Sequence, residues 1–348
     1  MDGRREFIQA GIAFVGCSLL GSAHAQTGKP VRREVLVSGK RVKTIDVHAH
    51  VAIPEAMALM GMKVAPQSLV MGEDRIRAMD AQGIDMAALS INPYWYKAER
   101  DVAEAVIKLQ NEKLAELCAA RADRFMGFAT VALQHPDLAA RQLEEGVKKL
   151  GLRGGSVGTN VNGEDLADPR FHPFWAKAEQ LGCLIFMHPN NGGADFEKRL
   201  KGSGGLANVI GNPLETTVAL SHLIFEGTLD RFPGLKICAA HGGGYLPSYA
   251  ARSDAGCVTF PDRCTKPLAK KPAEYLKQLY YDTIVFTPEA MRHLAAEVGA
   301  GQILMGTDYP FPWEKASVNL ILGTPGLSDA EREAILGGTA ARLLGIKS

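Results

Sequence analysis

Five side chains that could bind a metal or move a proton come at the ends of apolar segments. His48 and His50 end the segment TIDVHAH, while His188, His241 and Asp308 end three later segments. Imidazoles with a carboxylate are typical ligands of zinc or another divalent transition metal. A lone histidine on a strand is more often a hydrogen-bonded core residue, but burying five polar groups is costly unless they share partners. The pattern therefore predicts a metal site.

Alternation along the first segment indicates which side chains share a face. Residues two apart on a β-strand point to the same side, so we expect His48 and His50 to face one site. Asp46 precedes His48 by two residues and falls on that side as well. We expect it to be either a further ligand or a partner that orients a ligand.

Along the chain, short apolar runs alternate with longer runs in which apolar residues have helical spacing. The short runs predict strands and the longer runs predict helices, and these elements must position the five residues. The predicted strands are Lys43–His50, Ile84–Ile91, Phe125–Leu133, Leu152–Thr159, Cys183–Pro189, Leu235–Gly243, Leu279–Val285 and Gln302–Pro310. The predicted helices are Asp101–Ala122, Asp137–Leu150, Pro173–Leu181, Pro213–Leu229 and Pro288–Val298.

Strands that are apolar throughout and followed by helices indicate a parallel sheet covered on both faces. About eight such units in roughly 300 residues is typical of an α/β fold of the (β/α)8 TIM barrel type. A doubly wound sheet is the alternative, but no G-x-G-x-x-G motif follows the first strand. We expect one barrel domain of the metal-dependent hydrolase type over residues 36–346. Its active site would lie at the C-terminal ends of the strands, where the five residues fall.

Composition argues against some partners. The chain has 39 Lys and Arg residues and 38 Asp and Glu residues, so its formal net charge is +1. It therefore lacks the excess of basic residues that favours binding to nucleic acid. The chain is 46% hydrophobic and 22% charged, an ordinary balance for a globular domain. We therefore expect a small-molecule substrate, with no nucleic-acid or membrane partner.

Residues 1–25 have the pattern of an export signal. Arg4 and Arg5 precede an apolar run, and Ala23-His24-Ala25 resembles a cleavage site. The paired arginines are similar to a twin-arginine signal, and about ten apolar residues are too few to span a bilayer. We expect a periplasmic protein exported by the twin-arginine route.

Two further features of the later chain bear on the site. The predicted connection Asn190–Asn212 is long and rich in glycine, and we expect it to be a lid because long loops in compact domains are usually functional. Cys257 and Cys264 flank a loop that contains proline and could form a disulfide in an oxidising compartment, but the sequence leaves this open. Cys183 and Cys238 are expected to be buried in strands.

The motifs, taken in order, resemble the amidohydrolase superfamily. D-x-H-x-H, FMHP, AHGGG and GTDYPFP occur in this order, and they are similar to the branch that contains aminocarboxymuconate-semialdehyde decarboxylase. The resemblance covers nearly the whole chain after the signal. It implies one divalent metal, zinc above all and manganese as the alternative, held by four residues: His48, His50, His188 and Asp308. It also implies that His241 is an acid/base without a bond to the metal.

Binuclear relatives carry a carbamylated lysine on the fourth strand, and this lysine is absent from LRGGSVGT. We therefore expect a mononuclear site.

The resemblance implies substrate-binding residues as well. Arg252 matches a family arginine that binds a substrate carboxylate across a dimer interface, so a homodimer is expected. Trp313 follows Asp308 closely and is expected to stack on a planar substrate. Asn190 stands where the family has an aromatic residue, and only Lys63 lies near the place of a second family arginine. These differences argue against aminocarboxymuconate as the substrate.

Two reactions fit this site. The first is decarboxylation of a small unsaturated or aromatic carboxylic acid, with His241 or Asp308 as proton donor and Arg252 holding a remaining carboxylate. The alternative is hydrolysis of a lactone, ester or amide at the same mononuclear site, with a metal-activated water as nucleophile. A metal-binding protein without catalytic activity is a third, weaker interpretation.

Overall fold

The computed structural model describes residues 32–190, 198–311, 313 and 317–347. The predicted export signal, residues 1–25, and residues 191–197 of the predicted lid lie outside the described residues. Within the described ranges, no helix combines the length and the apolar character needed to cross a membrane.

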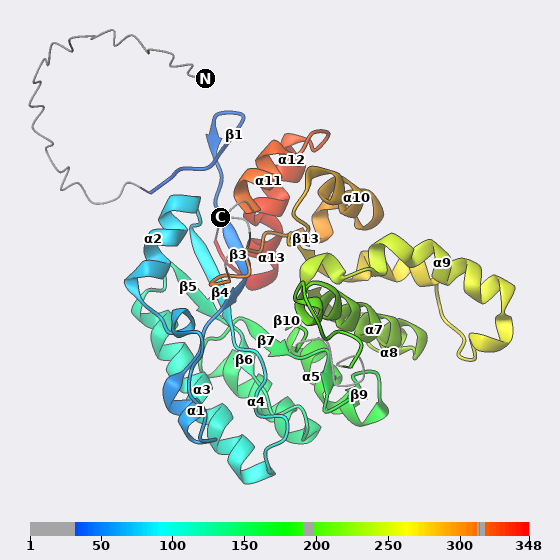
Figure 1. Ribbon diagram of the computed structural model, residues 1–348, viewed down its shortest axis with the longest axis horizontal. Helices are drawn as coiled ribbons and strands as arrows, with labels where there is room; N and C mark the ends of the chain where they lie inside the picture. The colour runs from blue at the N-terminus through cyan, green and yellow to red at the C-terminus, as the bar shows by residue number, and fades with distance from the viewer. Residues whose placement is uncertain (1–31, 191–197, 312, 314–316, 348) are drawn as a thin grey trace, which may run out of the picture. The chain divides into compact units, whose positions relative to one another are not determined.

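Parallel strands form a closed ring at the centre of the fold (Figure 1). One run of neighbours consists of β3 (Ile45–His50), β4 (Met86–Ser90) and β5 (Phe125–Gly127). The second run consists of β6 (Ala129–Thr130), β7 (Gly154–Val157), β10 (Leu184–Met187), β11 (Lys236–Ala239), β12 (Tyr280–Asp282) and β13 (Ile303–Leu304). β5 pairs with β4 while β6 pairs with β7, so the two together occupy one position of the ring.

The ring closes between β3 and the residues that follow β13. The Val47 N–H donates to Met305 O at 2.9 Å, and the His50 N–H donates to Tyr309 O at 2.7 Å. Ala49 and Tyr309 form a parallel bridge. The predicted (β/α)8 TIM barrel is therefore confirmed, although the last predicted strand, Gln302–Pro310, is regular only over two residues. Its remainder still pairs with β3 at Met305, Asp308 and Tyr309, but the left-handed backbone at Asp308 interrupts the regular strand.

Helices lie outside the strands (Figure 1). They are α1 (Pro54–Ala58), α2 (Glu73–Gln82), α3 (Arg100–Ala120), α4 (Pro136–Lys148), α5 (His172–Leu181), α7 (Asn212–Phe225), α8 (Thr228–Arg231), α9 (Leu246–Thr259), α10 (Pro288–Val298), α11 (Ser317–Gly323), α12 (Asp329–Glu333) and α13 (Thr339–Leu344). The predicted helix Pro213–Leu229 is two helices, because the backbone at Gly227 is left-handed, with φ 76°. Two antiparallel hairpins, β1–β2 (Leu36–Val37 and Lys40–Arg41) and β8–β9 (Asn160–Val161 and Glu164–Asp165), add to the barrel.

Alternation along the strands divides the core into two parts. Residues such as Ile185 and Ile237 belong to the larger hydrophobic cluster, which includes the inner faces of the helices. Leu184 and Phe186 belong to a separate cluster inside the ring. Each fully buried side chain of this kind contributes about 2–3 kcal/mol. The same period of two places His188 above Phe186 on the inner face.

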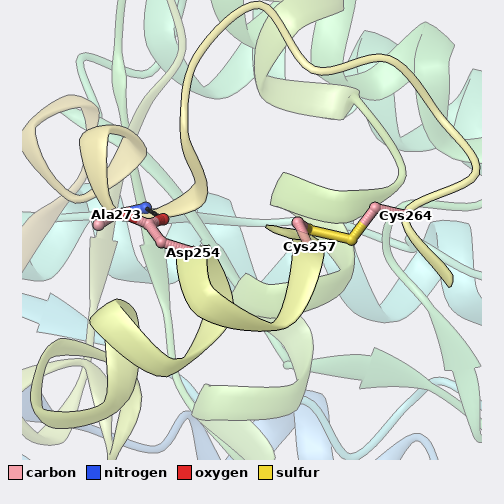
Figure 2. The surroundings of a disulfide bond; sticks show 4 residues. All are labelled: Asp254, Cys257, Cys264 and Ala273. Atoms are coloured by element: carbon pink, nitrogen blue, oxygen red, sulfur yellow. Dashed lines mark hydrogen bonds between the residues drawn. A yellow bond between two sulfur atoms is a disulfide. The ribbon is translucent and has the colours of Figure 1, made fainter. Parts of the chain in front are cut away.

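α9 and the residues after it extend away from the strands (Figure 1). Cys257 and Cys264 are joined by a disulfide, and the Ala273 N–H donates to Asp254 at 2.9 Å (Figure 2). The segment after α9 is thus fastened to the helix at two points. Cys118, Cys183 and Cys238 are free and buried, as expected for the last two.

Candidate metal centre

Four predicted ligands converge at the C-terminal ends of the barrel strands. His48 and His50 end β3, His188 follows β10, and Asp308 follows β13. Each offers one ligand atom, and these atoms all lie within 4.8 Å of one another. All four side chains are buried. The barrel thus joins residues that are far apart in the sequence into one compact group.

The spacing of the donor atoms fits a metal ion. His48 Nε2 lies 3.0 Å from His50 Nε2 and 3.1 Å from Asp308 Oδ1, and His50 Nε2 lies 2.9 Å from the same oxygen. Ligand atoms at right angles around an ion with bonds of about 2.1 Å are about 3.0 Å apart. Nitrogen and carboxylate donors at this spacing suit a divalent transition metal.

The electrostatics of the site also favour a cation. Burial lowers the pKa of His48, but the charge of Asp308 and the hydrogen bond with Asp282 outweigh it and raise the pKa to about 10. Burial raises the pKa of Asp308, yet the charge of His48 and the hydrogen bonds from His48 and His50 hold it below the usual range. Two buried carboxylates therefore attract positive charge at the point where the histidines meet.

Two of the histidines are held in the neutral form that binds a metal. Burial is the main cause that lowers the pKa of His188 well below its ordinary value, and the charges of the neighbouring histidines lower it further. Burial also lowers the pKa of His50, although the hydrogen bond with Asp308 opposes this. The described residues thus provide a mononuclear site for one divalent metal.

Asp282, at the end of β12, orients His48 and was missed in the sequence. His48 Nδ1 donates to Asp282 Oδ2 at 2.6 Å, and both side chains are fully buried. This bond leaves Nε2 of His48 directed at the other ligands. Asp282 also accepts the N–H groups of His241 at 3.0 Å and Gly242 at 2.9 Å. The available signal was an aspartate inside the apolar run LYYDTIV, near a strand end.

Asp46 lies beside the ligand group and is not a member of it. The pairing of β3 with β4 shifts register between Asp46 and Ala49, so the regular alternation assumed for this strand is interrupted. Asp46 Oδ1 accepts the N–H groups of His48 and Thr307 at 3.0 and 3.1 Å, and Oδ2 accepts the Thr307 hydroxyl at 2.6 Å. Of the two roles the sequence allowed, the geometry fits the partner that orients a ligand.

Backbone conformation at the site is unusual. His241 and Asp308 have φ of 57° and 59°, in the left-handed region. Such residues often mark functional sites, because the surrounding structure must hold the strain. At Gly306, a Cβ atom would lie 2.9 Å from Cβ of His48 and 3.0 Å from Cβ of Asp282. Glycine is therefore required at this position to let the His48–Asp282 pair form.

His241 lies beside the ligand group and faces open space. Its Nε2 is 3.8 Å from Asp308 Oδ2, and its side chain is 12% exposed against 5% for that aspartate. Among the described residues, its Nδ1 has no hydrogen-bond partner. His241 also lines a cavity of about 480 Å³. These features fit a histidine that exchanges protons with a bound molecule.

The three predicted substrate-binding residues do not lie together. Trp313 lines the same cavity as His241, and its Nε1 donates to Asp308 Oδ2 at 2.6 Å. Asn190 donates to Pro93 O at 3.3 Å and is not among the residues that line this cavity. Arg252 is exposed on α9 and lines a different cavity, of about 550 Å³. Within one chain, the described structure therefore does not bring Arg252 to the ligand group.

The fold and the site define a TIM-barrel enzyme with a mononuclear divalent metal centre. The chain belongs to the amidohydrolase family, whose sequence profile matches residues 45–346.

Three similar proteins are decarboxylases. The 2-amino-3-carboxymuconate-6-semialdehyde decarboxylase of Dictyostelium discoideum is 32% identical over 280 residues, covering 78% of this chain and 76% of that protein. A 5-carboxyvanillate decarboxylase from Sphingomonas paucimobilis has 25% identity and a TM-score of 0.81, covering 88% of this chain and 100% of that one. A dihydroxybenzoic acid decarboxylase from Polaromonas sp., solved with manganese and the inhibitor 2-nitroresorcinol, has 28% identity and a TM-score of 0.79, covering 88% and 97%.

Replacing Asp282 tests the orienting role. We expect Asp282→Asn to weaken metal binding about 10- to 100-fold, because the amide no longer holds His48 as a charged acceptor does. Competition with a fluorescent chelator measures this affinity. Asp85→Asn is the matched control, since Asp85 is a buried aspartate that pairs with Arg32 and Arg41 away from the ligands. Unchanged affinity in Asp282→Asn would contradict the assignment.

Proposed function

We propose that the protein is a metal-dependent decarboxylase, a carbon–carbon lyase that acts on a small aromatic carboxylic acid. The observation that carries this proposal is the position of His241, beside Asp308 and at the wall of a cavity next to the four-ligand group. The three relatives support it, because each is a decarboxylase. Nothing comparable favours the hydrolase alternative.

The reaction needs a proton at a defined place. The bond between the ring carbon and the carboxylate breaks, CO2 leaves, and the electron pair that remains on the ring carbon takes up a proton. A bound divalent ion would supply a point of attachment for the substrate's oxygen atoms and withdraw electron density from the ring.

His241 is the better proton donor of the two candidates. Asp308 is held ionised and its Oδ2 already accepts a hydrogen bond from Trp313, so it has no proton to give. The Asp308 carboxylate, 3.8 Å from His241 Nε2, stabilises the protonated imidazole before transfer. An imidazole exchanges protons near neutral pH, which suits this step.

For the metal, we propose manganese in preference to the zinc that the sequence favoured. The manganese in the Polaromonas structure supports the same choice for this chain.

We also propose that the protein is exported to the periplasm through the twin-arginine route. The motif at Arg4 and Arg5 motivates this. The disulfide between Cys257 and Cys264 supports it independently, because disulfides persist in oxidising compartments.

Finally, we propose a homodimer formed through α9 and the residues after it. Tyr249, Val258 and Phe260 are 62%, 83% and 49% exposed there. Apolar side chains gathered on one extended segment are favoured where a second copy covers them. Arg252 lies on the same helix and would be part of this contact.

The reaction is tested by measuring CO2 release from a panel of aromatic acids with manganese-loaded, zinc-loaded and chelator-stripped protein. We expect activity with manganese, less with zinc, and none without metal. His241→Asn should lower kcat at least about 100-fold while metal is retained. In D2O, the product should carry one deuterium at the carbon that lost CO2. His222→Asn, on the surface helix α7, is the control and should behave as wild type. Opening of lactones without CO2 release would establish the hydrolase instead.

Export is tested by fractionating cells that produce the full chain. Wild type should appear in the periplasm, shortened after Ala25, with three thiols open to alkylation after denaturation: Cys118, Cys183 and Cys238. The double variant Arg4→Lys, Arg5→Lys should remain uncleaved in the cytoplasm, with Cys257, Cys264 and the retained Cys17 also reactive. Wild-type protein found uncleaved in the cytoplasm would refute the proposal.

Oligomeric state is tested by light scattering after gel filtration. Tyr249→Asp combined with Val258→Asp should convert the dimer to a monomer, because two buried charges would face an apolar contact. Val102→Asp, at a 38% exposed position on α3, is the control and should leave the dimer intact. A monomeric wild type excludes this interface.

A further inference from the structure

Phe286 has a backbone conformation that aromatic residues rarely adopt. Its φ is 64°, and the left-handed region is shared at this end of the barrel by His241 and Asp308. Histidine and aspartate are enriched in that region, whereas a bulky side chain there is an outlier. Strain of this kind is kept mainly where function requires the position.

The segments before and after Phe286 in the chain both fix this conformation. The Thr287 N–H donates to Val285 O at 2.9 Å and closes a three-residue turn centred on Phe286. The Thr287 side chain then caps α10 by accepting the Ala290 N–H at 3.1 Å. On the other side the turn follows β12, whose Asp282 orients His48. Phe286 is therefore fixed relative to the metal ligands.

The ring of Phe286 faces Trp313. Their centroids are 5.5 Å apart at an interplanar angle of 52°, and both residues line the cavity of about 480 Å³ that includes His241. Phe286 is nevertheless 50% exposed. A molecule in the cavity would bury this half-exposed ring against its surface.

The cavity lacks charged side chains of the lysine, arginine, aspartate and glutamate types among the described residues that line it. Its walls are mostly apolar, with Val209, Val285 and Leu294 as examples. Asn212 also lines it, is 6% exposed, and has an Oδ1 without a hydrogen-bond partner in the described structure. The two imidazoles on its walls are already engaged, His241 beside Asp308 and His293 with the Ser248 hydroxyl. Among the described lining residues no other cationic side chain is available to a second carboxylate, so its desolvation would be costly. A neutral hydrogen-bonding group could instead satisfy Asn212.

We propose that Phe286 is a specificity residue, which with Trp313 binds the uncharged ring of a monocarboxylic aromatic acid while the carboxylate lies at the metal centre. This inference rests on the proposed function and narrows its substrate class. It excludes substrates with a second carboxylate, which Arg252 was expected to hold.

Ligand binding tests the inference apart from turnover. Of the three tryptophans, Trp95 and Trp175 are fully buried, so quenching of tryptophan fluorescence in the metal-loaded protein reports on Trp313. The probes are 2-hydroxybenzoate and its dicarboxylic counterpart 4-hydroxyisophthalate. We expect wild type to bind the monocarboxylate at least about tenfold more tightly. Phe286→Ala should weaken that binding about three- to tenfold, the range of an aromatic pair.

A second variant separates binding from stability. Phe286→Gly should bind as weakly as Phe286→Ala and yet melt no lower than wild type, because glycine adopts the left-handed region without strain. Leu36→Ala is the control, since Leu36 is 49% exposed and does not line the cavity. It should leave binding unchanged.

The outcomes are distinct. Lower melting temperatures in both Phe286 variants with unchanged binding would overturn the inference and make Phe286 structural. Tighter binding of the dicarboxylate, lost in Arg252→Ala, would overturn it by showing that a second copy supplies a cation to the cavity. The expected binding pattern without CO2 release from any acid would support the inference while refuting the proposed function.

Discussion

A single buried hydrogen bond, from His48 Nδ1 to Asp282 Oδ2, is the interaction on which the rest of the site depends. An unpaired carboxylate in this buried environment would be costly, so both oxygens of Asp282 need hydrogen-bond donors. It accepts from His48 and from the backbone of His241 and Gly242. One residue thereby sets the tautomer of a ligand and the position of the proton donor. Gly306 is part of the same constraint, because any larger residue would push His48 and Asp282 apart.

Closure of the barrel supplies the remaining ligands. The seam between β3 and the residues after β13 brings Asp308 next to His48 and His50, and Asp46 fastens it through Thr307. Arg75, buried on α2, donates to the carbonyl of His50 and lies over the ring of Tyr309 at 4.4 Å. At the C-terminal end of the barrel strands, His241 and Asp308 have strained, left-handed backbone conformations. The stability of the packed ring sustains geometry that the local sequence alone would not adopt.

The metal centre and the cavity have different parts in function. The ligand set provides the metal site, which in the proposed reaction attaches and activates a carboxylic acid. The cavity contributes the Phe286–Trp313 pair, and its described lining residues include no lysine, arginine, aspartate or glutamate. Trp313 connects the two, because it lines the cavity and donates to Asp308. In the proposed reaction, substrate choice and proton transfer would therefore be linked through this side chain.

The sequence by itself predicted the barrel and a metal site at its strand ends, and the family resemblance named the ligand set. Apolar runs of strand length and polar residues at their ends are local signals, as at His188 and His241. Only the tertiary structure decided which residue orients His48, because Asp282 comes from a strand more than 200 residues away. It likewise placed Asp46 beside the ligand group, where it bonds to Thr307, placed Arg252 apart from the metal centre, and joined Cys257 to Cys264. Phe286 gave no signal at all in the sequence. Its role depends on a backbone angle and a neighbouring ring, and both exist only once the chain has closed on itself.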